Sequence, residues 1–159
     1  MKGRPPLARL AFPELAASAG RMGAAGNRDG AIRLYADWLR HNPKSPSAFA
    51  AHFNTGCLLQ EAGRFEDALV AYAACLRANP QFVQTRLNLG NTLDRLGRRD
   101  EAVAEWRKLL VGPVDPALTR IALNNLGLVL ELAGQWGEAI AMLSRSLAID
   151  PQQDEVIYH

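Results

Sequence analysis

The sequence contains few cysteines, few lysines, little net charge and no long apolar run. Two cysteines among 159 residues are too few for a disulfide scaffold. The formal charge of +2, from 18 basic and 16 acidic residues, is too even for a chain that neutralises many phosphates, so we expect no nucleic-acid partner. The apolar runs fall short of the roughly 20 residues that cross a bilayer, so we expect no membrane span.

The remaining composition is typical of an ordered globular chain, with 48% hydrophobic and 21% charged residues. Only three of the basic residues are lysine and alanine is abundant, which suggests a GC-rich bacterial coding sequence. Arg9 interrupts the stretch that would have to be the apolar part of a signal peptide. We therefore predict a cytoplasmic protein in which Cys57 and Cys75 are free thiols.

The residue sets that catalysis needs are also absent from the sequence. No histidine lies three or four residues from another histidine or from a cysteine, as a helical metal pair requires. There is no Cys-X-X-Cys, no phosphate-binding glycine loop and no Gly-X-Ser-X-Gly turn. We therefore expect no catalytic residue, no metal and no cofactor. His41 is interpreted as a helix-end cation and His52 as a packing residue, and the tryptophans as packing residues rather than stacking platforms: Trp38, Trp106 and Trp136.

The chain does contain an internal repeat, which decides the fold prediction. Gly56, Gly90 and Gly127 each lie in the middle of a helical pattern, at spacings of 34 and 37 residues. Glycine inside a helix costs about 1 kcal/mol against alanine, so a neighbouring helix is expected to pack closely there. Each glycine is followed by an alanine, which we expect to face it, then by a bulky apolar residue and a proline: Ala68, Ala102, Ala139; Tyr72, Trp106, Leu143; Pro80, Pro116, Pro151.

A second set of glycines, Gly63, Gly97 and Gly134, follows where a left-handed residue would end a helix, which predicts hairpin corners. The helix pairs are then expected at 12–25 with 29–41, 47–62 with 65–78, 81–96 with 99–111, and 117–133 with 136–149. The first pair is a worn copy, because Ala19 replaces the helical glycine. It keeps the other repeat residues Gly26, Ala31, Tyr35 and Pro43.

These residues resemble the tetratricopeptide repeat family, whose pattern combines a large residue, Leu-Gly, Ala, an aromatic residue and Pro over 34 positions. The last copy matches it at Leu123, Leu126, Gly127, Leu130, Ala139, Leu143 and Pro151. The resemblance implies an all-α, right-handed solenoid of antiparallel helix pairs, with three good repeats, a degenerate N-terminal one and the start of a further helix. We expect an extension at 1–11 and one solenoid at 12–159, with repeats at about 12–45, 49–82, 83–116 and 120–153.

The resemblance also implies that the first helix of each pair lines a concave groove. Two residues before each helical glycine stands an asparagine, Asn54, Asn88 or Asn125, whose amide could bind the backbone of an extended peptide. The alternative is that these asparagines bridge neighbouring helices. The other candidate groove residues are Asn91, Asp94, Arg95, Asn124 and Glu131. The basic clamp of the chaperone-binding members looks incomplete, because the corresponding helices supply Phe53, Cys57 and Leu87.

The asparagine-rich segments at 88–91 and 124–127 resemble the N-terminal repeats of bacterial SPINDLY-like O-linked N-acetylglucosamine transferases. This implies a module that binds a protein or peptide for a glycosyltransferase whose catalytic domain would lie downstream. The alternative is a free-standing scaffold or adaptor in a bacterial complex. A third hypothesis is self-association through the C-terminal helix, because Val156, Ile157 and Tyr158 would be exposed.

Overall fold

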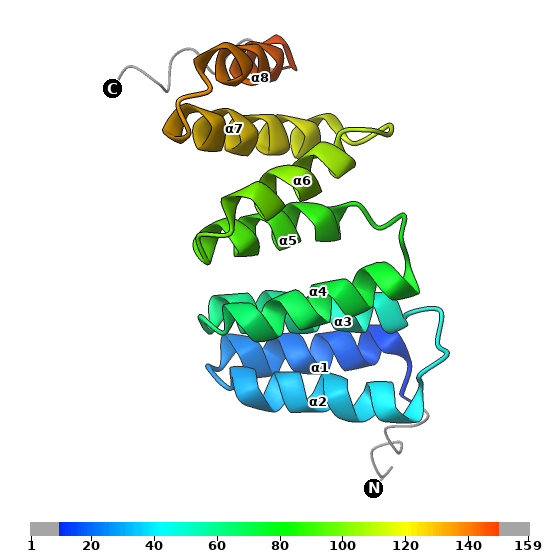
Figure 1. Ribbon diagram of the computed structural model, residues 1–159. Helices are drawn as coiled ribbons and strands as arrows, with labels where there is room; N and C mark the ends of the chain where they lie inside the picture. The colour runs from blue at the N-terminus through cyan, green and yellow to red at the C-terminus, as the bar shows by residue number, and fades with distance from the viewer. Residues whose placement is uncertain (1–9, 150–159) are drawn as a thin grey trace, which may run out of the picture. The chain divides into compact units, whose positions relative to one another are not determined.

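The computed structural model describes residues 10–149, which form eight α-helices and no strand (Figure 1). The all-helical prediction is confirmed, and the observed helix bounds differ from the predicted ones by at most three residues. The predicted start of a further helix and the repeat proline Pro151 lie outside the described residues. The helices are α1 (Phe12–Ala24), α2 (Arg28–His41), α3 (Ala48–Glu61), α4 (Phe65–Ala78), α5 (Gln84–Arg95), α6 (Arg99–Leu109), α7 (Pro116–Leu132) and α8 (Trp136–Ile149).

Local signals in the sequence account for where the helices begin and end. The Asn27 side chain caps α2 by accepting a hydrogen bond from the Gly30 N–H at 3.0 Å, and Asp115 caps α7 in the same way. The four corners within the helix pairs are glycines with φ between +73° and +81°, a conformation that other residues rarely adopt. The corner prediction is therefore confirmed at Gly63, Gly97 and Gly134.

The glycines in the middle of α3, α5 and α7 make room for a bulky side chain on the second helix of the pair. A Cβ atom at Gly56 would lie 2.5 Å from the ring of Tyr72, and one at Gly127 would lie 2.6 Å from Leu143. Gly90 meets the indole of Trp106 in the same manner. The close approach is as predicted, and the expectation that the buried Ala68, Ala102 and Ala139 face the glycines stays a prediction. The residue one helical turn after each alanine fills the space.

The chain divides into two compact units, Met1–Thr85 and Arg86–His159. In the first unit, α1, α2 and α3 share a core of Leu15, Ala19, Ala31, Tyr35, Trp38 and Ala51. The segment between α4 and α5 is held to α3 by Phe82, whose ring centroid lies 5.1 Å from that of Phe49 and 5.0 Å from that of Phe53. The prediction of one solenoid over 12–159 stays a prediction.

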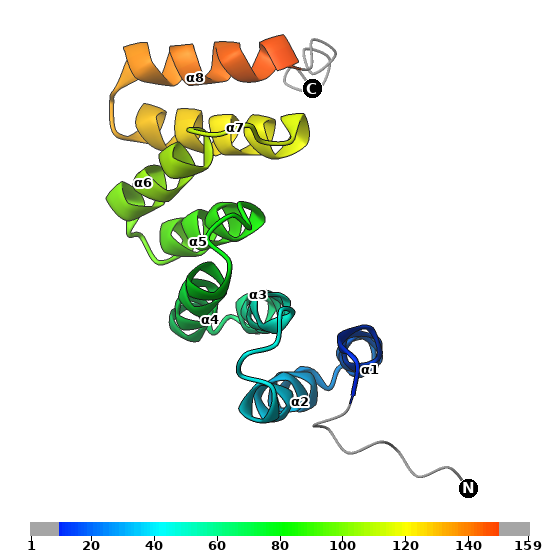
Figure 2. The ribbon, with the colours of Figure 1, turned by 90° about the vertical axis from the view of Figure 1, so that its right-hand side faces the viewer.

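In the second unit, α7 and α8 form an antiparallel hairpin (Figure 2), and α6 packs against α7. Trp106 and Leu109 of α6 and Leu123 of α7 are buried. The packing interpretation is confirmed for Trp38 and Trp106, which are 2% and 1% exposed. It is wrong for Trp136, which is 61% exposed. Helices α7 and α8 also carry exposed apolar residues, which we call the α7–α8 face: Leu128, Leu132, Trp136 and Ile140.

Candidate functional site

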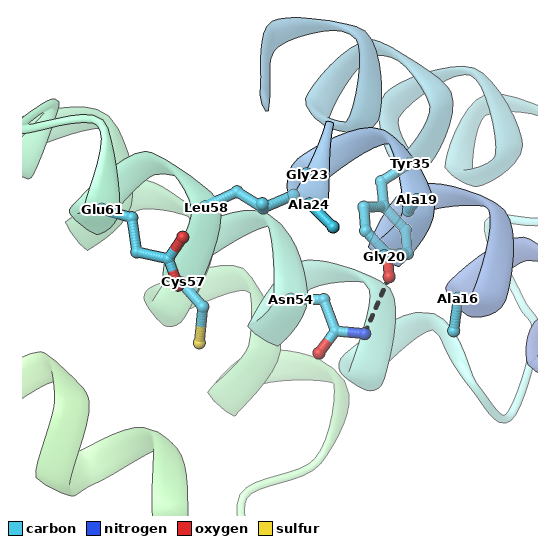
Figure 3. Close-up of a pocket in the computed structure, with 10 residues that line it drawn as sticks. All are labelled: Ala16, Ala19, Gly20, Gly23, Ala24, Tyr35, Asn54, Cys57, Leu58 and Glu61. Carbon is cyan, nitrogen blue, oxygen red and sulfur yellow. Dashed lines mark hydrogen bonds between the residues drawn. The ribbon is translucent and has the colours of Figure 1, made fainter. Parts of the chain in front are cut away.

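The first unit contains a pocket between α1 and α3, the first helices of adjacent pairs (Figure 3). Its volume is about 360 Å³, at the lower end of the range for small-ligand pockets. One wall is the face of α1 and the other is the face of α3, with Tyr35 of α2 reaching in between them. The lining residues are Ala16, Ala19, Gly20, Gly23, Ala24, Tyr35, Asn54, Cys57, Leu58 and Glu61.

The predicted site residue Asn54 lines this pocket and also connects two helices. Its Nδ2 donates a hydrogen bond to the Tyr35 hydroxyl at 2.9 Å. Asn54 is half-buried, and Tyr35 is 3% exposed. The amide oxygen of Asn54 takes no part in this contact, and within residues 10–149 the Tyr35 hydroxyl donates its own hydrogen to no other group. The pair can offer a ligand one acceptor and one donor.

Burial keeps the Tyr35 hydroxyl in its neutral form. Desolvation raises the pKa of Tyr35 above its usual value, while the hydrogen bond from Asn54 acts in the opposite direction. A neutral phenol retains the hydrogen that it can donate. The Tyr35 hydroxyl can therefore donate a hydrogen bond at physiological pH.

The face of α1 that lines the pocket is almost bare of side chains. Ala19 aligns with Gly56 of the next pair, so Ala16, Gly20 and Ala24 occupy the positions of Phe53, Cys57 and Glu61. The sequence prediction did not include this bare face of α1, because it placed the site on the repeated asparagines. Aligning the worn first copy with the others could have revealed it.

The predicted site residues of the second unit form a separate set. Asn125 of α7 donates from Nδ2 to Oδ1 of Asn91 in α5 at 2.7 Å, so the structure brings these two together. Asn88 and Asn124 are half-buried on the same two helices. Asp94 forms an ion pair with Arg99 at 3.7 Å, which turns it toward the corner of its own hairpin.

The last two predicted residues, Arg95 and Glu131, are exposed near the ends of α5 and α7. A second hollow, of about 480 Å³, lies between α6 and the α7–α8 hairpin. It is lined by the ion pair of Arg107 and Glu138 and contains none of the predicted site residues. The candidate site is therefore best defined in the first unit.

The thiols and histidines have the structural surroundings expected of them. Cys75 is fully buried, lies 3.0 Å from the Thr85 hydroxyl, and has a raised pKa because of desolvation. The half-buried Cys57 lines the α1–α3 pocket. His41 ends α2, and burial followed by the charge of Arg77 lowers the pKa of His52. Within residues 10–149, no group of three His, Cys, Asp or Glu side chains is placed to hold a metal ion.

Comparison with known proteins decides the family. A family model described as "Tetratricopeptide repeat" matches residues 23–81 and 87–154, and a second model with the same description matches residues 59–110. The chain belongs to the tetratricopeptide repeat family. The matched residues are repeat units rather than an enzyme domain, and such repeats generally mediate protein–protein interaction.

The relatives agree with this family. Human "Tetratricopeptide repeat protein 28" is 29% identical over 108 residues, which are 68% of this chain and 4% of that protein. A tetratricopeptide repeat protein from Parabacteroides merdae ATCC 43184 has a TM-score of 0.79 at 20% identity, covering 88% of this chain and 54% of that one. A crystal structure of MamA has a TM-score of 0.76 at 18% identity, covering 90% and 80%. At these identities the two structures show a shared fold.

The remaining sequence predictions concern membrane spans, cellular location and source of this tetratricopeptide repeat chain. Among the helices of residues 10–149, none is long and apolar enough to cross a membrane. The cytoplasmic location and the bacterial origin stay predictions.

Proposed function

We propose that this chain is a protein-interaction module that binds an extended segment of a partner protein along its first helices, with the α1–α3 pocket as the main contact of the first unit. The supporting observation is the hollow of about 360 Å³ between two first helices, which contains Asn54 and the Tyr35 hydroxyl. Apolar walls with a few convergent polar groups are typical of binding sites.

The polar groups of the pocket favour an extended segment over a helical one. A helix uses its backbone N–H and C=O groups internally, so the free amide oxygen of Asn54 and the Tyr35 hydrogen would find no backbone partner on it. An extended segment exposes both kinds of group. In the second unit the pair of Asn91 and Asn125 has the same chemistry. Contact with ligand remains our hypothesis for the full set, Asn54, Asn88, Asn91, Asp94, Arg95, Asn124, Asn125 and Glu131.

The experiment is a selection of phage-displayed random peptides on the immobilised chain. The pocket is blocked in Ala24→Trp, because Ala24 is exposed and lines the pocket, whereas Ala36→Trp adds the same side chain to an exposed position of α2 outside it. We expect the selected peptides to bind the wild type and the Ala36 variant, and to lose most of their binding to the Ala24 variant. Equal binding to both variants would remove the pocket from the proposal.

Two hypotheses describe the larger protein or complex in which this module works. The hypothesis of an association with a glycosyltransferase rests only on the resemblance of the segments at 88–91 and 124–127, whereas the family is compatible with a free-standing scaffold. The reading frame after His159 separates these two hypotheses, because a nucleotide-sugar domain there supports the first and a stop codon supports the second.

Self-association is a further proposed property of the same module. The apolar tail residues Val156, Ile157 and Tyr158 lie outside the described residues. The α7–α8 face supports the hypothesis by itself, because Leu132 and Ile140 are 70% and 65% exposed.

A further inference from the structure

We infer that the α1–α3 pocket is a subsite for a basic side chain, lysine or arginine, of the bound segment. The stem of this side chain lies on the bare face of α1 and its cation reaches the carboxylate of Glu61. The inference rests on the proposed binding of an extended segment, and it adds the chemistry that the pocket selects.

The glycines of α1 are not required by the packing of the chain itself. A Cβ atom at Gly20 would meet nothing within 4 Å, and one at Gly23 would meet only the Leu58 side chain at an ordinary 3.6 Å. At Gly56, by contrast, the Tyr72 ring occupies the space. Glycine lowers helix stability relative to alanine, so two such residues in α1 weaken the helix without any internal contact that needs them. Their effect is to keep the wall of the pocket open.

The charge of the pocket comes from one residue. Of the ten lining residues, only Glu61 carries a charge, and its side chain is 61% exposed. Its Oε2 lies 3.5 Å from Nε of Arg28, whose side chain is 47% exposed, and an ion pair with this exposure is weak. A carboxylate has two oxygens and accepts several donors, so Glu61 can receive a second cation. The pocket therefore complements a positive charge.

The spacing on α3 relates this charge to the hydrogen-bonding pair. Asn54 and Glu61 are seven residues apart, which is about 10 Å along a helix axis. An extended segment advances about 3.3 Å per residue, so the basic residue lies within about three residues of the peptide unit that Asn54 holds. Lysine and arginine place an apolar stem on an apolar wall while the charged head stays near water. The wall of Ala16, Gly20 and Gly23 followed by Glu61 has this arrangement.

The test uses three acetylated and amidated decapeptides of serine, glycine and alanine that differ only in a central lysine, glutamine or glutamate. Each is titrated into the isotope-labelled full chain, and the backbone amide signals of Gly20, Gly23 and Glu61 are followed by NMR. We expect the lysine peptide to bind about two- to five-fold more tightly than the glutamine peptide, the range for an exposed charge pair. This preference should shrink as salt is added.

Charge variants then assign the preference to Glu61. In Glu61→Gln the lysine and glutamine peptides should bind equally, and in Glu61→Lys the glutamate peptide should bind best. Glu14→Gln is the matched control, because Glu14 is an exposed carboxylate of α1 outside the pocket, and it should retain the wild-type preference.

The outcomes separate this inference from the proposed function. Equal binding of the three peptides by the wild type, or a lysine preference that persists in Glu61→Gln, overturns the basic subsite but leaves the binding of extended segments intact. Preference for the glutamate peptide would make Arg28 the contact and would also overturn it. An absence of shifts at these amides with every peptide counts against the subsite, while the phage selection with Ala24→Trp judges the proposed function independently.

Discussion

The contact between Gly90 and Trp106 allows a stability prediction whose magnitude follows from the structure. A Cβ atom at Gly90 would lie 2.7 Å from Cδ1 and 2.8 Å from Cε2 of the Trp106 ring. Trp106 is 1% exposed, and its indole N–H donates to the Leu87 carbonyl at 3.4 Å. The ring therefore has little room to move away, and Gly90→Ala should force α5 and α6 apart.

Two opposing terms set the size of the effect. Overpacking of this kind typically costs about 1–3 kcal/mol, whereas alanine in place of glycine stabilises a helix by about 1 kcal/mol. Gly90→Ala should therefore lower the free energy of unfolding by up to about 2 kcal/mol. Gly20→Ala is the control, because it gains the helix term and meets no neighbour within 4 Å. The two variants should differ by about 1–3 kcal/mol, since the helix term cancels.

The assay is thermal unfolding of both variants, followed by far-ultraviolet circular dichroism. For a chain of this size, the expected difference corresponds to about 2–12 °C in Tm, with Gly20→Ala the more stable. Gly127→Ala should cost less than Gly90→Ala, because the Leu143 side chain that it meets is more flexible than an indole ring. If the Gly90 and Gly20 variants melted together, the close-packing explanation of the helical glycines would be wrong.

Three further predictions concern other parts of the chain. Phe82→Ala removes two aromatic contacts to α3 and should cost at least about 1–3 kcal/mol in a denaturant titration, since each pair contributes about 0.5–1.5 kcal/mol in addition to the burial of the ring. Burial raises the pKa of Tyr35 in the folded chain above its value of about 10 in the unfolded chain. The neutral hydroxyl therefore contributes its full stability below about pH 10, and this contribution is lost as the pH rises through the pKa of the folded state. Tyr35→Phe, measured in that alkaline range, should lose less stability with rising pH than the wild type does. Leu132→Glu places a charge on the exposed α7–α8 face and should reduce any concentration-dependent association seen by sedimentation; a wild type that is monomeric at all concentrations would contradict this prediction.

Helix existence and helix ends were predictable because they depend on local chemistry. Apolar periodicity placed the eight helices of residues 10–149, and the corner glycines marked where a positive φ is needed. The start of α5 was predicted three residues early, because the aromatic packing of Phe82 against α3 holds that segment in a loop, and this contact is distant in sequence. Trp136 occupies a helical position whose burial depends on what packs next to α8, which periodicity does not contain.

The candidate site was predictable only in part. The repeat identified Asn54 as a first-helix residue. The structure adds that its amide, on α3, contacts Tyr35 on α2 of the preceding helix pair. That partner could not be derived from the spacing, because the side chain of Tyr35 comes from a second helix of the preceding pair. The sequence does contain the alanine- and glycine-rich stretch that forms the bare face of α1. The sequence does not contain the fact that a Cβ atom at Gly20 would meet no neighbour within 4 Å, whereas one at Gly90 would meet Trp106.

The asparagines allow the last prediction, which weighs helix bridging against ligand binding. The contacts of Asn54 with Tyr35 and of Asn125 with Asn91 join adjacent helix pairs, so replacing each asparagine with alanine should remove about 0.5–1.5 kcal/mol of stability. If the remaining amide atoms also hold a peptide backbone, each replacement should cost a similar amount in binding. The triple alanine variant at Asn54, Asn88 and Asn125 would then bind roughly ten-fold to a thousand-fold more weakly.

Two measurements on one preparation separate the two roles. The affinity for a phage-selected peptide is determined per folded molecule, and the same sample is then unfolded with denaturant. A double-mutant cycle of Asn91→Ala and Asn125→Ala measures the bridge by itself, because the two side chains contact each other at 2.7 Å and should therefore couple in stability. If the triple variant loses stability and the affinity per folded molecule is unchanged, the asparagines only bridge helices, and the hydrogen-bonding part of the proposed groove must come from the Tyr35 hydroxyl instead.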